Sequence, residues 1–483
     1  GGDTDNWMWP RHTGDFSIFR VYAGKDNEPA DYSEDNVPFH PKKSFKISRA
    51  GAQPGDFTFV YGCPGSTREY VLSDEVRYIS EISDPQKIDL RTQRLDIQKK
   101  YMNADQAVRI QYSSKNASVS NAWKKWQGEA RGIEKMNTVA SKKAFEKRFR
   151  EWAKGTEYDG LVEKLSGLYQ RREPYYNAYE NYTETIRTIE LLQFASSVRA
   201  SLSAKRPLEG TVESFFKDYY QPIDEEIFVA MLEAFDSHLT DGYKPEWFRR
   251  KLAEYGSVTA WRDDLYAKSL FTDRARVEAL TEADLPKVLA DPAWELWDAF
   301  QQWYKQDLQP VIDETSREIR LAYREYMQAR MEFEPEKAFY PDANLTLRVA
   351  YGHVAGYSPS DAVYYAPVST LKGIMEKDNP DIFDYNIPQV LRDIYAEGGH
   401  EAQPVCFLAT NHTSGGNSGS PVINADGNLI GINFDRVWEG TMSDLVFDPD
   451  YCRNISLDIR YLLFVIREIG HADWLFDEME FVD

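Results

Sequence analysis

The stretch TSGGNSGSPVINADGNLIGINFDR occupies residues 413–436 and places small residues on both sides of a serine, Ser418. Glycine and serine neighbours suit a loop whose backbone N–H groups turn inward while a hydroxyl stands clear of its strand. Two short apolar runs then flank Asp426-Gly427, a strong signal of a tight β-hairpin. The stretch therefore predicts a serine-bearing loop that leads into a hairpin. On this pattern alone, an ordinary Gly/Ser hairpin loop is the alternative.

A loop of this kind can carry covalent chemistry. Ser418 would be the nucleophile, and the backbone amides of Gly416 and Ser418 would form the oxyanion hole. A hairpin whose second strand returns past such a serine is the layout of the second barrel of chymotrypsin-like peptidases. Residues 415–436 resemble the serine segment of the bacterial dipeptidyl peptidase 7 and 11 family. Their ending FDR, rather than FDG, resembles the dipeptidyl peptidase 11 branch and implies cleavage after Asp or Glu.

Composition excludes several classes of protein. The chain has 483 residues, which predicts two or three domains. A hydrophobic content of 42% with 14% aromatic residues is typical of a globular protein. The formal net charge of −21 argues against nucleic acid and against anionic membrane surfaces as partners. No run approaches the roughly 18 apolar residues that a membrane span requires.

The first 75 residues predict β structure. Short runs rich in Phe, Ile, Val and Tyr predict strands at 16–22, 43–48 and 56–61. Three or four strands form only half of a small barrel and leave an unpaired edge, so we expect a segment upstream to complete the barrel. The sequence begins at Gly1 without a methionine or a signal peptide, which we interpret as an internal cut.

A second family-like segment lies in this block. Residues 2–17 read GDTDNWMWPRHTGDFS, and two tryptophans with a proline ahead of a strand are unusual for a solvent loop. The segment resembles the aspartate segment of the same family, and the resemblance implies that Asp15 orients the catalytic histidine. Without the resemblance, an Asp that opens a strand is more often a turn residue.

A helical period replaces the strand period from about Val76 to Lys337. Within it, Ser83-Asp84-Pro85 predicts a helix cap with proline in the first turn. We expect an inserted domain that caps the cleft, because an exopeptidase must block the chain beyond the dipeptide. Strand character returns at 344–351 and 405–410, and the amphipathic segment 455–469 predicts a C-terminal helix.

Together these elements predict an α+β protein with a chymotrypsin-like double β-barrel and a large inserted α-helical domain. Residues 1–75 would form the C-terminal half of the first barrel, which carries the catalytic Asp and is incomplete. Residues 76–337 would form the cap domain. Residues 338–483 would form the second barrel, which carries the nucleophilic Ser and ends in the C-terminal helix.

The catalytic base is missing from this pattern. A serine hydroxyl is a poor nucleophile without an adjacent histidine held by a carboxylate. Of seven histidines, His12 belongs to the aspartate segment, His412 lies where the floor of the P1 pocket is expected, and His353 is out of chain order. The others have no motif around them. In the family the histidine lies in the first half of the first barrel, so we expect this polypeptide by itself to be inactive.

Substrate-binding residues follow from the resemblance. It implies four groups that hold the free N-terminal amine of a peptide: Asn6, the backbone of Trp7, Asn121 and Asp435. A buried ammonium needs a carboxylate, which suits Asp435. For Asn121, a helix-capping residue is the alternative. Arg436 on the returning strand would pair bidentately with an Asp or Glu side chain at P1, the alternative being a strand-end arginine that points to solvent.

The sequence thus predicts a serine exopeptidase that releases N-terminal dipeptides with Asp or Glu at P1. A dipeptidyl peptidase 7-like activity with a hydrophobic P1 and a non-catalytic peptide-binding module are the alternatives. No metal or cofactor is implied, and the expected partners are peptides with a free N-terminus. The resemblance implies a homodimer in the periplasm or at the cell surface of a Gram-negative bacterium. The cysteines Cys63, Cys406 and Cys452 leave open a Cys406–Cys452 bridge or ordinary thiols.

Overall fold

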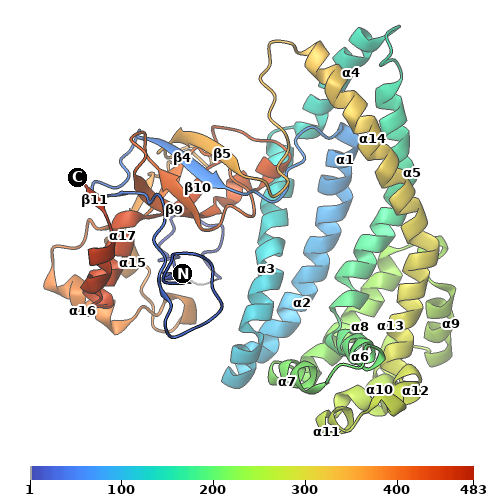
Figure 1. The fold of residues 1–483 in the computed structure, drawn as a ribbon. Coiled ribbons are helices and arrows are strands. Elements are labelled where there is room, and N and C mark those ends of the chain that lie inside the picture. Colours follow the sequence, from blue (N-terminus) through green and yellow to red (C-terminus); the bar gives the residue numbers. More distant parts are fainter. Residues whose placement is uncertain (1–2) are drawn as a thin grey trace. The chain divides into compact units, whose positions relative to one another are not determined.

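Two units make up the chain in the computed structural model, which describes residues 3–483 (Figure 1). One unit holds the segments 3–70 and Tyr340–Asp483 and contains the β-sheet. The other unit holds Val71–Phe339 and is helical. The fold is therefore α+β, and the chain returns to the sheet unit after a long helical excursion.

The sheet is assembled from both ends of the chain. Its main path runs β5-β4-β8-β9-β10-β7-β6 with antiparallel neighbours, and β3 and β11 add parallel pairings beside β9. Strand β4 comes from the first segment and pairs with β5 and β8 from the second, so both segments share one curled sheet. The bounds are β3 Ile47–Ser48, β4 Phe57–Gly62, β5 Arg348–His353, β6 Val368–Thr370, β7 Pro404–Ala409, β8 Ser420–Ile423, β9 Leu429–Arg436, β10 Asn454–Asp458 and β11 Phe481–Val482.

The sheet is buried on both faces at β7. Cys406 and Leu408 pack into one apolar cluster together with α17 (Ile459–Phe464), whereas Phe407 and Ala409 pack into another. A strand with two buried faces reads as a continuous apolar run, which explains the sequence VCFLA. Helices α15 (Leu371–Glu376) and α16 (Gln389–Glu397) complete this unit.

The predicted hairpin after the serine loop is confirmed. Strands β8 and β9 are antiparallel, with Ser420 opposite Asn433 and a turn at Ala425–Asn428 between them. Gly427 has a φ of +82°, which glycine adopts without a steric penalty. The hairpin therefore brings the second strand back past the serine loop.

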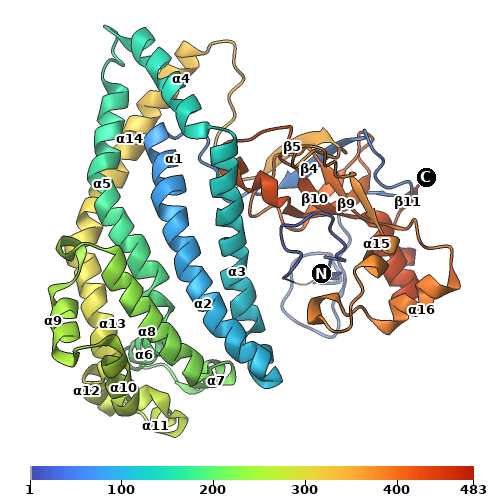
Figure 2. The same ribbon diagram turned by 180° about the vertical axis from the view of Figure 1, so that it is seen from behind.

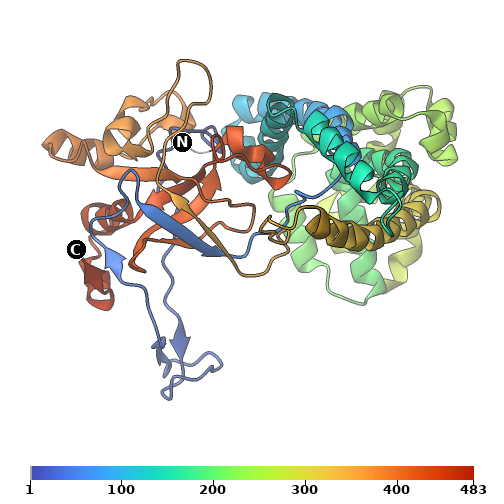
Figure 3. The same cartoon turned by 90° about the horizontal axis from the view of Figure 1, so that it is seen from above.

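The predicted strand at 16–22 is wrong. Residues 11–21 have no regular secondary structure, and the strand pairing is limited to β1 (Tyr22–Ala23) with β2 (Val37–Pro38). Figure 3 shows this short ladder extending away from the sheet. Phe19 is 86% exposed. A β-rich composition does not make a strand unless a partner strand completes the hydrogen bonds, and within residues 3–483 only the end of this run has one, at Tyr22.

The predicted C-terminal helix at 455–469 begins too early. Residues up to Asp458 form β10, and the helix starts only at Ile459. Ile455 and Leu457 pack into the cluster with α17, while Asn454 and Ser456 point the other way and are also buried. This alternation has period two, but two buried faces concealed it from an amphipathic pattern.

The helical unit begins with a single continuous rod. The π-helical turn Ile79–Ser83 joins α1 to α2 without a break, so Ser83 does not cap α2 as predicted; its hydroxyl donates to Glu180 instead. Figure 2 shows α2 and α3 side by side. The helices are α1 Ser73–Tyr78, α2 Asp84–Ala104, α3 Gln106–Lys135, α4 Thr138–Ala153, α5 Leu161–Glu184, α6 Glu190–Ser203, α7 Glu209–Lys217, α8 Gln221–His238, α9 Glu246–Tyr255, α10 Val258–Lys268, α11 Arg274–Glu278, α12 Leu285–Leu289, α13 Pro292–Trp303 and α14 Gln309–Phe333.

Candidate functional site

Ser418 lies in the loop between β7 and β8, and its side chain is exposed. Its hydroxyl donates to the backbone carbonyl of Phe434 on β9, with Oγ and O 3.2 Å apart. The neighbouring amide of Gly419 donates to the carbonyl of Asn433 at 2.8 Å. The serine is therefore held against the returning strand of the hairpin.

Buried asparagines fix the shape of this loop. The side chain of Asn417 accepts from the amide of Ser414 at 3.0 Å, and its backbone carbonyl accepts from the side chain of Asn433 at 3.1 Å. Asn433 in turn accepts from Asn454 on β10 at 2.9 Å. At the start of the loop, Asn411 accepts from the hydroxyl of Thr58 on β4 at 2.8 Å. These hydrogen bonds between buried asparagines and their neighbours pin the loop to three strands, β4, β9 and β10.

The backbone around the serine includes a glycine that no other residue could replace and two amides without acceptors in the described chain. Gly416 has a φ of +103°, and a Cβ there would lie 2.5 Å from the carbonyl oxygen of Cys63. Only glycine fits such a position. Among residues 3–483, neither the amide of Gly416 nor that of Ser418 donates a hydrogen bond. Two amides without acceptors beside a serine hydroxyl are suited to bind a developing oxyanion.

Asp15 is exposed, in a segment without regular secondary structure. Within the described residues it makes no hydrogen bond to Ser418 or to a histidine. His12 is half-buried, and burial together with the charge of Lys377 lowers its pKa to about 4. The Nε2 of His412 lies 3.1 Å from the carbonyl oxygen of Ser443 and donates to it, because a carbonyl oxygen can only accept. No histidine in residues 3–483 hydrogen-bonds to Ser418, whose hydroxyl contacts the carbonyl of Phe434 instead.

Asp435 is the centre of a buried cluster that joins the two segments. Its Oδ2 accepts from the Nη1 of Arg11 at 2.9 Å and from the backbone amide of Trp7 at 3.1 Å. Its Oδ1 accepts from the amide of Arg436 at 2.8 Å. Burial raises the pKa of Asp435, and the charge of Arg11 opposes this increase. The carbonyl of Trp7 accepts from the amide of Trp438 at 2.7 Å, which closes the segment onto the 3₁₀ turn that follows β9.

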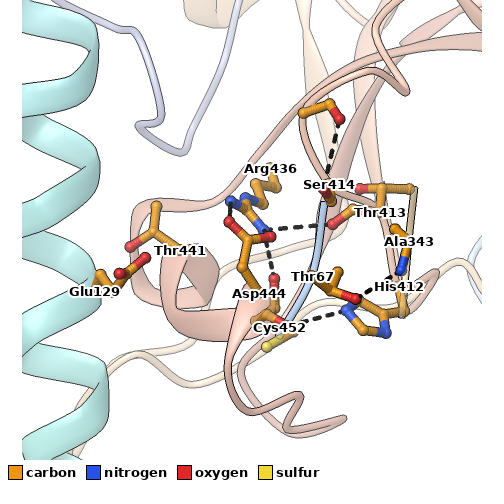
Figure 4. Close-up of polar contacts among 12 residues, drawn as sticks. Thr67, Glu129, Ala343, His412, Thr413, Ser414, Arg436, Thr441, Asp444 and Cys452 are labelled. Carbon is orange, nitrogen blue, oxygen red and sulfur yellow. Dashed lines mark hydrogen bonds and ion pairs between the residues drawn. The ribbon is translucent and has the colours of Figure 1, made fainter. Parts of the chain in front are cut away.

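Arg436 does not point to solvent. Its side chain is 7% exposed, and Asp444 pairs with it bidentately at 2.7 and 2.8 Å (Figure 4). The hydroxyl of Ser443 accepts from Nη1 at 2.6 Å, and the ring of Trp7 lies over the guanidinium at 5.6 Å. Burial works against the charge, but the contacts with Asp444 outweigh it and raise the pKa of Arg436. Arg436 is thus a fixed cation beside the serine loop.

The remaining two predicted residues differ in their location. Asn6 is half-buried and directly precedes Trp7 in the turn that covers Asp435. Asn121 lies in the middle of α3 in the helical unit, so it does not cap a helix, which removes that alternative. Within the sheet unit, Asn6, Trp7, Asp435 and Arg436 are brought together.

Sequence reasoning missed Arg11, Ser443 and Asp444. The signal for Arg11 was present, since a buried Asp435 requires a cation, but nothing local says which of the chain's many cations supplies it. Asp444 follows Arg436 by eight residues through a 3₁₀ turn, Trp438–Asp444, that the sequence does not announce. Turns of this kind are recognised only from the folded chain.

Metal centres, membrane spans and disulfides are three further features that the described part of the chain could contain. Residues 3–483 contain no group of three or more His, Cys, Asp or Glu side chains placed to hold a metal ion. No helix among them is both long enough and apolar enough to cross a bilayer. Cys406 and Cys452 are unpaired and buried, so the possible bridge between them is not formed; Cys63 is unpaired and exposed. Burial raises the pKa of Cys406 to about 12 and that of Cys452 to about 11.

Comparisons with known proteins point in one direction. Residues 1–481 match the family model described as Peptidase S46. An Asp/Glu-specific dipeptidyl-peptidase of Flavobacterium psychrophilum is 40% identical, over 100% of this chain and 71% of the relative. A dipeptidyl-peptidase 7 of Phocaeicola vulgatus is 33% identical, over 100% of this chain and 70% of the relative. The crystal structure of Porphyromonas endodontalis DPP11 with the dipeptide Arg-Glu matches with a TM-score of 0.88 at 35% identity, covering 99% of this chain and 72% of that one.

Proposed function

The chain belongs to the peptidase S46 family, and from this premise we propose that it is a serine dipeptidyl peptidase that releases N-terminal dipeptides with Asp or Glu at P1. The buried Arg436 carries the proposal. Ser418 bonds to the carbonyl of Phe434, and Arg436 lies two residues further along the same strand, a rise of roughly 6.6 Å. A peptide whose scissile carbonyl meets Ser418 would extend its P1 side chain over this distance to the guanidinium.

Charge also favours an acidic P1 in spite of the chain's net charge of −21. Carboxylates farther than a Debye length of about 8 to 10 Å are screened by salt. A desolvated charge pair at contact is screened far less, and removing one of its partners costs on the order of 2 to 5 kcal/mol. The local arginine therefore decides the specificity, while the distant charges slow the approach of an acidic peptide.

The amine of the peptide would bind on the other side of the site. Asp435 keeps one acceptor position on Oδ1, because three donors occupy the remainder of its capacity. An ammonium at this carboxylate would require a free N-terminus two residues before the cleaved bond. The turn at Asn6 and Trp7, which covers Asp435, would provide the neighbouring acceptors, and Asn121 would join them from the helical unit.

We also propose the finer architecture of a chymotrypsin-like double barrel, with residues 1–75 in the first barrel, residues 76–337 as its helical insertion and residues 338–483 in the second barrel. Tyr351 on β5 pairs with Phe59 on β4, and Tyr351 is 73% exposed. In residues 3–483, strand β5 is paired on one side only. An open edge with an exposed apolar face is suited to further strands, which would carry the histidine base.

Two experiments test the proposed specificity and chemistry. Replacing Arg436 with glycine should move cleavage from acidic towards neutral P1 residues, and an unchanged preference would exclude its role in specificity. Since no described histidine reaches Ser418, we expect no turnover from these 483 residues alone. A longer chain that includes the additional length of the relatives should release dipeptides. Activity of the shorter chain that Ser418→Ala abolishes would contradict this expectation.

The same pair of chains separates the alternatives. Release of dipeptides with a hydrophobic P1 would favour a dipeptidyl peptidase 7-like activity. If neither chain released dipeptides but peptide binding were retained, a binding module would be favoured. The homodimer and the periplasmic or surface location stay proposals from family resemblance, and sedimentation of the longer chain with fractionation of the producing cell would test them.

A further inference from the structure

Arg436 retains donors that the described part of the chain does not satisfy. A guanidinium carries five N–H donors in a plane. Asp444 accepts one from Nη1 and one from Nη2, and Ser443 accepts the second from Nη1. The Nε of Arg436 is buried and has no hydrogen-bond partner within residues 3–483. The N–H of Nε and one N–H of Nη2 are therefore left over.

These two donors lie on one edge of the guanidinium and point in the same direction. Two parallel N–H groups are the arrangement that a carboxylate accepts bidentately. The opposite end of the guanidinium is already closed by Asp444, and the ring of Trp7 covers its face. A buried donor without an acceptor is costly, so a ligand that accepts from it gains the full bond.

We propose that Asp444 is a positioning residue for acidic P1 recognition, holding the end of Arg436 so that the free Nε/Nη2 edge takes the P1 carboxylate side-on. This inference rests on the proposed function. It assigns to Asp444 a task beyond neutralising a buried cation, because the ion pair selects which edge of the guanidinium remains open. Ser443 supports the same orientation through Nη1.

The geometry predicts that the site distinguishes glutamate from glutamine at P1. The Arg436–Asp444 pair is neutral as a whole, so an acidic side chain is recognised by directed hydrogen bonds more than by excess positive charge. A P1 glutamine has the shape of glutamate but offers one acceptor and one NH₂ group. Its NH₂ would face an N–H of Arg436, and a buried donor would stay unsatisfied. The site should therefore reject glutamine although the two side chains are of equal size.

Binding of product dipeptides to this chain tests the inference without requiring catalysis. The ligands are Arg-Glu and Arg-Gln, which share the amine and the terminal carboxylate. Calorimetry should show that the native chain binds Arg-Glu at least tenfold more tightly than Arg-Gln. Asp444→Asn should weaken Arg-Glu at least tenfold and leave Arg-Gln within twofold. Asp450→Asn removes the same charge from an exposed position nearby and should change neither affinity.

The outcomes distinguish a failure of the proposed P1 specificity from a failure of the role assigned to Asp444. No preference of the native chain for Arg-Glu would overturn the proposed specificity and this inference with it. A native preference that Asp444→Asn leaves unchanged would overturn the inference alone. Tighter binding of Arg-Glu by Asp444→Asn would overturn it too, since Asp444 would then compete with the substrate.

A second variant and a spectroscopic signal guard against misfolding of Asp444→Asn. Ser443→Ala keeps the ion pair and the backbone carbonyl that His412 contacts, and should lower the Arg-Glu preference by about threefold to fivefold. In ¹⁵N spectra, the Nε–H resonance of Arg436, identified by its loss in Arg436→Lys, should move downfield with Arg-Glu and stay in place with Arg-Gln. An Nε–H that does not respond to Arg-Glu would exclude side-on binding.

Discussion

Removal of Arg11 should destabilise the sheet unit more than removal of any ordinary surface arginine. Arg11 is 6% exposed and Asp435 8%, and the two are 2.9 Å apart. Arg11 also donates to the carbonyl of Asp5 at 2.6 Å and to the hydroxyl of Thr13 at 2.8 Å. The guanidinium of Arg11 lies over the ring of Phe434, and Arg11→Met keeps an apolar side chain there but leaves Asp435 buried without its cation. Breaking a buried pair from one side costs about 3 to 5 kcal/mol.

Hydrogen exchange read by mass spectrometry measures this cost in one unit at a time. Amides of β9 and β10 should exchange more than about 100-fold faster in Arg11→Met, because each 1.4 kcal/mol or so changes the open population tenfold. Peptides from the helical unit of the same sample should be unchanged. Arg20→Met is the matched control, since Arg20 pairs with Glu478 at the surface. An exposed pair of this kind is screened by solvent and should contribute little to stability.

The pH dependence provides an independent check on the same variant. Burial raises the pKa of Asp435 above its unfolded value, and loss of Arg11 should raise it further. A carboxyl group with a raised folded pKa favours folding when protonated, and this stability is lost as the pH rises through the folded pKa. The deficit of Arg11→Met should therefore shrink as the pH falls from 7 towards 5. A deficit equal to that of Arg20→Met, or one that grows on acidification, would refute the reasoning.

The remaining predictions concern the serine loop and the thiols. Gly416→Ala should destabilise the loop by about 1 to 3 kcal/mol, because φ is +103° and a Cβ would meet the carbonyl of Cys63. In the control Gly415→Ala, the added Cβ meets nothing within 4 Å and should cost less than about 1 kcal/mol. Hydrogen exchange of the loop amides measures both effects. An alkylating reagent at pH 8 should label exposed Cys63 rapidly and leave Cys406 and Cys452 unlabelled until the sheet unit unfolds, because both thiols are buried and burial raises their pKa. The intact mass of the native protein should show a single adduct. Two or three adducts would contradict this prediction.

Local signals predicted the serine hairpin correctly. Asp426-Gly427 encodes its own turn, because glycine alone adopts the required φ, and the apolar runs on both sides have a fixed partner a few residues away. The segment 16–22 has equally strong strand composition, but in the described chain only its last residue, Tyr22, enters a ladder, which is two residues long. The segment 455–458 was misassigned for the opposite reason, since burial on both faces hides the period of two.

The sequence by itself determined the chemical groups of this protein: a serine among glycines, an aspartate segment far upstream, and an arginine on the strand that returns past the serine. Only the tertiary structure decided how their charges are paired, with Arg11 reaching Asp435 across 424 residues and Asp444 closing one end of Arg436. Secondary-structure propensity and hydrophobic periodicity depend on residues that are close in sequence, so they do not predict contacts between residues this far apart. Burial of an ion is tolerated only where a counterion arrives from elsewhere in the fold, so the partner is chosen by the packing of the whole unit.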